Sequence, residues 1–182
     1  MEEFKEILAR EFAPFGALSE SQLRLLEMHY ELLLRWNRKL NLTRITELSE
    51  AVQLHYCESL YLAEFLPKHS LKVIDVGSGA GFPGIPLAIY RADCSVDLVE
   101  SHQRKAVFLT DTVRQLGLAN VSVVAKRAQD VAGLYDWVVS RAVNPDEVLA
   151  LGLGADVAIL GNAGQKLPWG DNRALFHVEH LD

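Results

Sequence analysis

Cysteine and long hydrophobic runs are both scarce in this chain. Cys57 and Cys94 are the only cysteines among 182 residues, and they match no metal-ligand spacing. These counts argue against a disulfide framework and a metal site, and they favour a reducing compartment. No stretch approaches the roughly 18 apolar residues of a membrane-spanning helix, and the N-terminal segment MEEFKEILAREF is charged throughout. We therefore expect a cytoplasmic protein without a metal or a membrane among its partners.

Basic residues are also fewer than acidic ones, and many of them cluster in two segments. The formal net charge is −6, which argues mildly against a nucleic acid as partner. Residues 35–44 nevertheless contain four basic residues and no acidic one, and residues 102–127 contain five basic residues against one acidic residue. Such segments predict local basic surfaces for an anionic polymer. For residues 35–44 the alternative is a helix end at which Lys and Arg offset the helix dipole.

A glycine-rich turn follows an apolar run in the middle of the chain. Residues 71–76 have the pattern of a short strand buried on both faces of a parallel sheet. Four glycines then fall within residues 77–84, where they permit positive φ and let a ligand approach the backbone without meeting a Cβ. Pro83 and Pro86 mark the first turn of a helix. The order of strand, glycine turn and helix predicts a nucleotide-type site at the carboxyl end of the strand.

The two parts of the chain differ in their periodicity. Residues 1–68 predict helices alone: one with an apolar stripe from Phe4 to Phe12 that ends near Pro14 and Gly16, one with a capping box at Ser19 and Gln22, and one from a Thr46 cap to about Leu66. Later apolar runs at 94–99, 121–125, 135–139 and 155–160 alternate with helical segments, as in a parallel sheet. We predict an α/β, Rossmann-like single domain over residues 1–182, with a helical extension (1–68) and a core (69–182). Its C-terminal part looks shortened, because residues 161–182 hold one plausible strand, Ala174–Val178.

Three polar residues lie on one face of the third predicted helix. His55, Glu58 and Ser59 have the spacing of helix neighbours, and Leu62 continues their stripe. Buried polar groups must find hydrogen-bond partners, so one interpretation is a network between helix and sheet. The other is that this face closes over the glycine turn.

The glycine turn admits two cofactors. Residues 79–84 formally match the dinucleotide pattern G-x-G-x-x-G, which would allow NAD. Counted from Gly77, directly after the strand, the sixth place is Phe82 and not the glycine required beneath a pyrophosphate. Asp75 before the glycines, and Glu100 at the end of the next strand, suit a cationic amino-acid end and a ribose. This arrangement favours S-adenosylmethionine.

Five segments also resemble a known family, the glucose-inhibited-division-B family of small-subunit ribosomal RNA guanine-N7 methyltransferases. They are WNRKLNLT (36–43), HYCES (55–59), DVGSGAGFPGIPL (75–87), VESHQRKAVFL (99–109) and SRA (140–142). The resemblance implies a class I S-adenosylmethionine-dependent methyltransferase fold. Two features depart from the family pattern: Glu58 stands where the family usually has Asp, and Leu160 stands where it tends to have Lys.

The resemblance also implies roles for single residues. Gly77 and Phe82 would lie along the cofactor, Glu100 would bind its ribose, Ala128 and Gln129 would border its adenine, and Arg141 would stand beside the reacting centre. The complete set of cofactor-binding candidates is Asp75, Gly77, Ser78, Gly79, Gly81, Phe82, Glu100, Ala128, Gln129 and Arg141. The RNA-binding candidates, chosen from the two basic segments, are Arg38, Lys39, Arg104 and Arg127.

The expected function is methylation of a guanine N7 in 16S ribosomal RNA, with ribosomal RNA or the small ribosomal subunit as partner and a monomer as the working form. The N7 lone pair is free at neutral pH, so no general base is required and no catalytic residue is assigned; Arg141 is the nearest candidate. Positioning must then supply most of the rate. The alternatives are a non-catalytic RNA-binding or ribosome-assembly module on the same fold and an NAD-dependent oxidoreductase.

Overall fold

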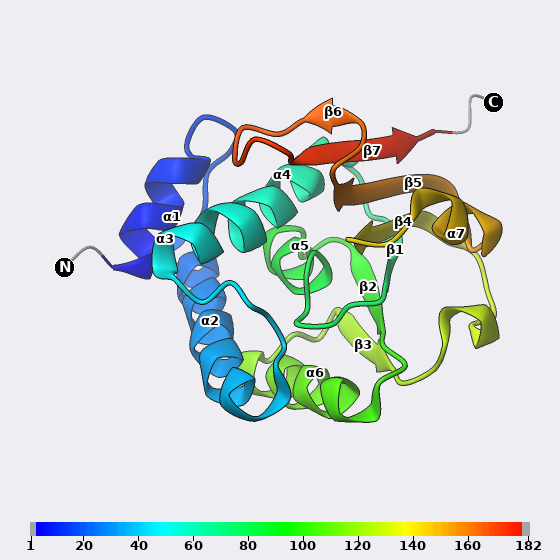
Figure 1. Ribbon diagram of the computed structural model, residues 1–182, viewed down its shortest axis with the longest axis horizontal. Helices are drawn as coiled ribbons and strands as arrows, with labels where there is room; N and C mark the ends of the chain where they lie inside the picture. Colours follow the sequence, from blue (N-terminus) through cyan, green and yellow to red (C-terminus); the bar gives the residue numbers. More distant parts are fainter. Residues whose placement is uncertain (1–2, 180–182) are drawn as a thin grey trace.

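The computed structural model describes residues 3–179, and the strands within this range form one sheet (Figure 1). The strand order is β3-β2-β1-β4-β5-β7-β6. The strands are β1 (Lys72–Val76), β2 (Ser95–Val99), β3 (Val121–Val124), β4 (Tyr135–Arg141), β5 (Gly154–Gly161), β6 (Gln165–Lys166) and β7 (Ala174–Val178). The first five are parallel, and β7 runs antiparallel between β5 and β6. The predicted α/β class with a parallel sheet is confirmed.

Helices cover the two faces of the sheet unequally (Figure 1). The helical segments are α1 (Phe4–Phe12), α2 (Glu20–Leu40), α3 (Leu48–Ala51), the π-helical segment η1 (Val52–Cys57), α4 (Glu58–Phe65), α5 (Gly84–Tyr90), α6 (Gln103–Leu116), the 3₁₀ turn η2 (Ala128–Asp130) and α7 (Pro145–Ala150). The larger core contains residues from α1, α2, α4, α5 and α6 together with the sheet. The smaller core, on the other face, includes Val148 of α7. The boundary near residue 68 remains a prediction, since both parts share the larger core. None of the described helices is long and apolar enough to cross a membrane.

Local capping signals fix the helix ends. Ser19 Oγ accepts the Gln22 N–H at 3.2 Å, and Gln22 Oε1 accepts the Ser19 N–H at 2.8 Å, so the predicted capping box is present. The prediction of a Thr46 cap was wrong. Glu47 caps α3 because its longer carboxylate reaches the N–H groups of both Ser49 and Glu50, while the Thr46 carbonyl accepts the hydroxyl of Tyr30.

The third predicted helix is also not continuous. Its central residues, Val52–Cys57, form a π-helical segment between α3 and α4.

Near the C-terminus, the strand predicted over Ala174–Val178 is confirmed as β7, which pairs with β5 along its length. The two-residue strand β6 completes the sheet. Neither β6 nor the short helix α7 was predicted from the sequence. The cap of α7 is the Asn144 side chain, which accepts the Asp146 N–H at 2.9 Å.

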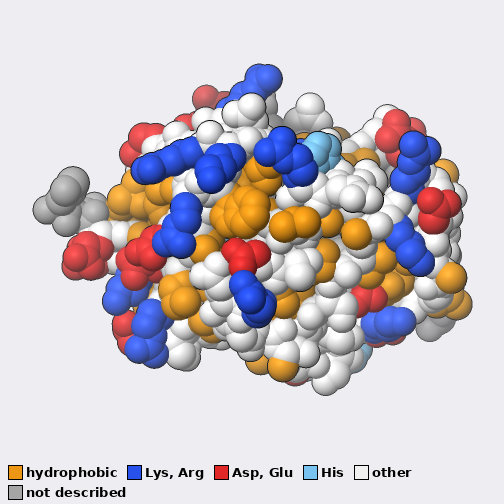
Figure 2. Space-filling model, turned by 90° about the horizontal axis from the view of Figure 1, so that it is seen from below, with side chains coloured by type: hydrophobic (Ala, Val, Ile, Leu, Met, Phe, Trp, Pro, Cys, Tyr) orange, Lys and Arg blue, Asp and Glu red, His pale blue; other side chains and the backbone are white. Residues whose placement is uncertain are grey.

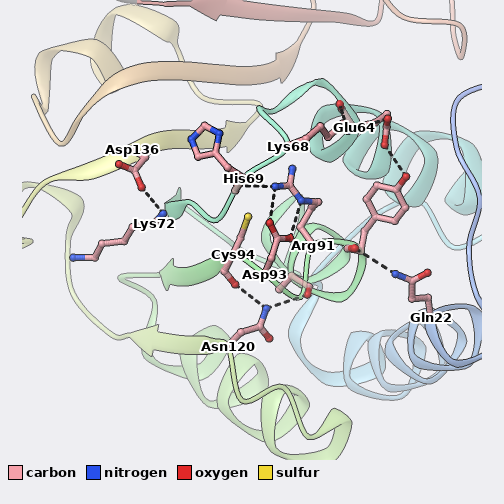
Figure 3. Close-up of polar contacts among 12 residues, drawn as sticks. Gln22, Glu64, Lys68, His69, Lys72, Arg91, Asp93, Cys94, Asn120 and Asp136 are labelled. Carbon is pink, nitrogen blue, oxygen red and sulfur yellow. Dashed lines mark hydrogen bonds and ion pairs between the residues drawn. The ribbon is translucent and has the colours of Figure 1, made fainter.

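A polar network joins the elements at the amino end of the parallel strands (Figure 3). Arg91 donates to both carboxylate oxygens of Asp93 at 2.9 Å and to the carbonyl of His69 at 2.8 Å. Asn120 donates to the carbonyl of Cys94 at 3.0 Å and to that of Ala88 at 3.1 Å. These bonds tie the end of α5 to the starts of β1, β2 and β3. At this end of the sheet, the side chains of Arg91 and Asn120 thus bond to neighbouring segments of the chain itself.

Candidate functional site

The glycine turn is fixed between the ends of β1 and β2. The N–H groups of Gly77 and Ser78 both donate to the carbonyl of Val99, at 2.9 and 3.0 Å. Gly77 has φ +71° and Gly79 has φ +56°, a conformation that side-chain-bearing residues rarely adopt. A Cβ on either glycine would have its nearest neighbour at 3.8 Å, so both glycines face open space. The turn thus presents bare backbone at the carboxyl end of β1.

Glu100 connects this turn to the start of α6. Its Oε2 accepts the Gly79 N–H and its Oε1 accepts the His102 N–H, both at 2.9 Å. The side chain is largely buried, with a residue exposure of 8%. Each carboxylate oxygen has a second lone pair, so Glu100 retains acceptor capacity after making both bonds.

A first hollow of about 380 Å³ opens beside the turn, at the carboxyl ends of β1 to β4. Its lining consists of Val76, Gly77, Val99, Glu100, Ser101, Lys126, Arg127, Ala128, Gln129 and Val143. Four predicted cofactor residues, Gly77, Glu100, Ala128 and Gln129, therefore lie around one space. Arg127, predicted from the sequence to contact RNA, also lines it.

Other predicted cofactor residues lie behind the turn and not in the hollow. Asp75 is fully buried, its Oδ2 accepts the Gly84 N–H at 2.9 Å, and its Oδ1 has no partner. Burial disfavours the charged carboxylate more than the bond from Gly84 favours it, and it raises the pKa of Asp75 to about 7. Ser78 is buried and donates its hydroxyl to the Asp75 carbonyl at 3.0 Å, and Gly81 is buried against Ile85. In this structure these residues shape the turn from within.

Phe82, Arg141 and His55 form a stack behind the turn. The rings of Phe82 and His55 are 4.6 Å apart and nearly parallel, and the guanidinium of Arg141 lies 5.0 Å from the Phe82 centroid. Arg141 donates to His55 Nδ1, so Nε2 carries the imidazole proton and donates it to Thr43 Oγ1 at 2.9 Å. Burial and the nearby Arg141 lower the pKa of His55 to about 2. Burial also lowers the pKa of Arg141 to about 10, so Arg141 stays charged at neutral pH.

The polar face of the third predicted helix makes buried contacts. The His55 ring stacks on Phe82 behind the glycine turn, and the Ser59 hydroxyl donates to the His55 carbonyl of its own helix at 2.6 Å. Glu58 is fully buried and receives two bonds from Arg173, of 2.7 and 2.6 Å. Arg173 was not predicted from the sequence. The available signal was Glu58 itself, because a buried acid requires a cation.

A second hollow of about 470 Å³ adjoins the first, and Val143 lines both. The other residues lining it are Ala142, Asn144, Pro145, Gly161, Asn162 and Arg173. The segment after β4 is held in an uncommon conformation, since Ala142 has φ +58°. Within residues 3–179 no carboxylate lines this hollow, and Glu58, which is bonded to the lining residue Arg173, is already paired with it.

The predicted RNA-binding residues divide between two places. Lys39 at the end of α2 and Arg104 at the start of α6 share a small hollow of about 170 Å³. Arg38 is exposed on the last turn of α2, whereas Arg127 lies in the first hollow. Figure 2 looks from below onto the face where α6 and the end of α2 lie, and it shows Lys and Arg side chains around a hydrophobic patch.

The family described as "rRNA small subunit methyltransferase G" matches residues 22–153. This chain belongs to that family. The match includes the glycine turn and the whole lining of the first hollow. It does not include residues 154–179, which nonetheless supply β5, β7 and Arg173.

Individual relatives agree with this assignment. A "Ribosomal RNA small subunit methyltransferase G" from Desulforamulus reducens is 39% identical over 140 residues, which are 73% of this chain and 58% of that relative. A protein of the same name from Dichelobacter nodosus is 48% identical over 120 residues, which are 64% of this chain and 56% of that relative. The chain thus spans a little over half the length of each.

Solved structures show the fold. A SAM-dependent methyltransferase from Aquifex aeolicus aligns with a TM-score of 0.52 at 22% identity, over 66% of this chain and 71% of that one. A SAM-dependent O-methyltransferase from Thermotoga maritima aligns with a TM-score of 0.53 at 17% identity, over 72% and 50%. The predicted Rossmann-like methyltransferase fold is confirmed.

Proposed function

We propose that this protein transfers a methyl group from S-adenosylmethionine to N7 of a guanine in 16S ribosomal RNA. The observation that carries the proposal is a pair of adjoining hollows with Val143 as a common wall, in a chain of the rRNA methyltransferase family. A transfer reaction needs a donor and an acceptor held side by side, and two hollows at one sheet edge provide that arrangement.

The chemistry of the turn favours S-adenosylmethionine over a dinucleotide. The N–H groups of Gly77 and Ser78 donate to Val99, that of Gly79 to Glu100, and that of Gly84 to Asp75. A pyrophosphate would need such amides at the helix start. S-adenosylmethionine has no phosphate, so a turn whose amides are already used suits it and argues against the NAD-dependent alternative.

Different residues around the first hollow would hold different parts of the cofactor. Gly77 offers backbone that a Cβ would obstruct, and Glu100 offers a carboxylate to the ribose hydroxyls; Gly79, whose N–H is bonded to Glu100, belongs to the same turn but does not line the hollow. Ala128 and Gln129, which also line the hollow, are assigned to the adenine. When bound, S-adenosylmethionine supplies an electrophilic methyl group on a sulfonium. Asp75 would act from behind, by holding the start of α5 through Gly84.

The second hollow suits the acceptor base. Guanine presents two acceptors, O6 and N7, on its exposed edge. Arg173 uses Nε and Nη2 for Glu58, so its Nη1 is available to donate to O6 while N7 stays free to react. The chain need not remove a proton, and its residues act by holding the base and excluding water. Arg141, held by His55 and Phe82 behind the turn, lines neither hollow and would help to position the reactants from behind.

Contact with RNA phosphates is assigned to Arg38, Lys39, Arg104 and Arg127. Ribosomal RNA or the small subunit is the proposed partner, with the protein acting as a cytoplasmic monomer. Among residues 3–179, no group of three or more His, Cys, Asp or Glu side chains is placed to hold a metal ion.

Methyl transfer tests the proposal directly. The protein is incubated with methyl-labelled S-adenosylmethionine and either naked 16S RNA or small-subunit particles, and the RNA is analysed for N7-methylguanine by borohydride–aniline cleavage. Label at one guanine in at least one substrate is the expected result. RNA binding without cofactor binding would instead support the non-catalytic module, and label on another base or atom would reject the guanine-N7 assignment.

A further inference from the structure

Trp36, near the end of α2, separates two hollows that lie away from the site described above. The larger, of about 300 Å³, is lined by Arg35, Trp36, Lys39, Asp111 and Gln115. The smaller, of about 170 Å³, is lined by Trp36, Lys39, Leu40, Arg104 and Val107. Trp36 and Lys39 line both. The indole of Trp36 is therefore accessible from both hollows.

The indole is held in place by a contact with the core. It packs against Phe108, a fully buried ring of α6, with ring centroids 5.8 Å apart and an interplanar angle of 64°. It also lines a hollow together with Asp111, whose pKa is lowered first by the hydrogen bond from Arg114 and then by Gln115, with a further contribution from the nearby Trp36. An aromatic ring fixed before binding loses little conformational freedom when a ligand stacks on it.

The surroundings of Trp36 are positive. Arg35, Lys39 and Arg104 are exposed, and none of them has an ion-pair partner among the described residues. Asp111 is the one acid among the described residues that line these two hollows, and it is already paired with Arg114 at 2.7 Å. The exposed side chain of Val107 adds apolar surface beside the ring. Unpaired cations around a fixed aromatic ring are the features with which proteins bind single-stranded nucleic acid.

We propose that Trp36 is a stacking platform for an unpaired nucleobase of the RNA substrate, whose flanking phosphates are held by Arg35, Lys39 and Arg104. This inference rests on the proposed function and adds to it a second contact, outside the two hollows at the sheet. Each hollow is too small for a duplex but admits one base turned out of a loop. The expected ligand is therefore a single-stranded or bulged RNA segment and not an RNA helix.

Tryptophan fluorescence tests the platform, because the other two tryptophans, Trp137 and Trp169, are buried at 2% and 6% exposure. The wild-type protein is titrated with a 16S-derived hairpin that has an unpaired loop and with a fully paired duplex of equal length. The hairpin should quench the fluorescence and the duplex should not. Trp36→Phe should bind the hairpin with near wild-type affinity but without quenching, because the stacking ring remains and the reporter is lost.

Trp36→Leu keeps apolar contact with Phe108 but removes the aromatic face. It should bind the hairpin about tenfold more weakly, a value within the usual contribution of one stacked base. The salt dependence should stay unchanged because the phosphate contacts remain, and S-adenosylmethionine affinity should also be unaffected. Unquenched wild-type fluorescence at saturating hairpin, or leucine-variant affinity within twofold of wild type, would overturn the platform while leaving the proposed function intact. No RNA binding by the wild-type protein would instead overturn both.

Discussion

The two ends of the parallel sheet differ in how their surroundings shift the pKa values of ionisable groups. At the amino end, Arg91 and Asp93 hold each other charged: their hydrogen bond raises the pKa of Arg91 and lowers that of Asp93. At the carboxyl end, burial lowers the pKa of His29 to about 4 and that of His55 to about 2, and it raises the pKa of Asp75 to about 7. The uncharged forms of His29 and His55 are thus favoured behind the glycine turn at neutral pH, while Arg141 beside them stays charged.

This difference follows from what each end must do. The amino end uses an ion pair and side-chain amides to join strands and helices, as the dashed contacts in Figure 3 show. The carboxyl end keeps the neutral His29 and His55, together with the charged Arg141, behind the turn and has hollows in front of it. Substitutions at the amino end should therefore alter stability alone, whereas substitutions at the turn should alter ligand binding.

The largest expected effect comes from Gly79→Val. A branched side chain at Gly79 would enter the open space beside the turn, so S-adenosylmethionine affinity should fall by more than about 100-fold, equivalent to about 2.7 kcal/mol. Gly152→Val is the matched control, because Gly152 has φ +61° against +56° for Gly79 and also faces open space. Calorimetric titration should find binding lost only in the first variant, and thermal melts should shift similarly in both. Full affinity in a folded Gly79→Val protein would remove the turn from the site.

The next effect concerns acid stability. His29 is fully buried, donates from Nε2 to the Ala80 carbonyl and accepts the Tyr56 hydroxyl at Nδ1. Its folded pKa of about 4 lies below the ordinary 6.5, so its contribution to stability is present above pH 6.5 and is lost as the pH falls through 4. The free energy of unfolding should drop by on the order of 3 kcal/mol more in wild type than in His29→Gln across that range.

Urea unfolding at a series of pH values measures this difference. Asp75 has the opposite linkage, because its raised pKa favours the folded state as pH falls, but it is present in both proteins and cancels in the comparison. Parallel stability curves for wild type and His29→Gln would show that His29 does not titrate in the folded protein.

A smaller loss of stability is expected at the amino end. Arg91→Gln removes the bonds to Asp93 and to the His69 carbonyl, and it should destabilise the fold by about 2 kcal/mol, as charged hydrogen bonds of this kind usually do. Arg114→Gln is the control, since Arg114 makes a surface ion pair with 79% of its side chain exposed. Cofactor affinity, measured on folded protein, should stay at the wild-type value. Weakened cofactor binding in Arg91→Gln would contradict the separation of the two ends.

The smallest effect is expected for the salt dependence of RNA binding. Reversing Arg38 and Lys39 to Glu should weaken RNA binding and reduce the salt slope by up to about two counterions. A double variant of two other exposed cations, Arg24→Glu with Lys166→Glu, changes the net charge equally and should change the slope less. If the variant of Arg38 and Lys39 bound RNA with the wild-type salt dependence, residues 35–44 would have no role in RNA binding and would only end a helix.

Elements set by neighbouring residues could be predicted from the sequence. The Ser19–Gln22 capping box and the strand before Gly77 depend on contacts within a few residues, and both were found where expected. The ion pair of Glu58 with Arg173 joins residues 115 positions apart, and no local pattern specifies it. The π-helical segment Val52–Cys57 was likewise invisible, because a helical hydrophobic pattern does not distinguish it from an α-helix.

The candidate site shows the same division. Gly77 and Glu100 could be assigned because a glycine turn and a strand-end acid have recognisable positions in the chain. The inward orientation of Asp75 and the place of Arg127 in the first hollow depend on how separate strand ends meet. Those are tertiary properties.

Calorimetric titration with S-adenosylmethionine of the wild-type protein and of Glu100→Gln tests most directly whether the first hollow is the cofactor site. The amide keeps one acceptor oxygen for the Gly79 or His102 N–H and loses the charge offered to the ribose. One molecule should bind per wild-type chain, and Glu100→Gln should weaken binding by about 1–3 kcal/mol, the usual cost of a lost charged hydrogen bond. Absence of wild-type binding, or a change below a few tenths of a kcal/mol in the variant, would contradict this assignment.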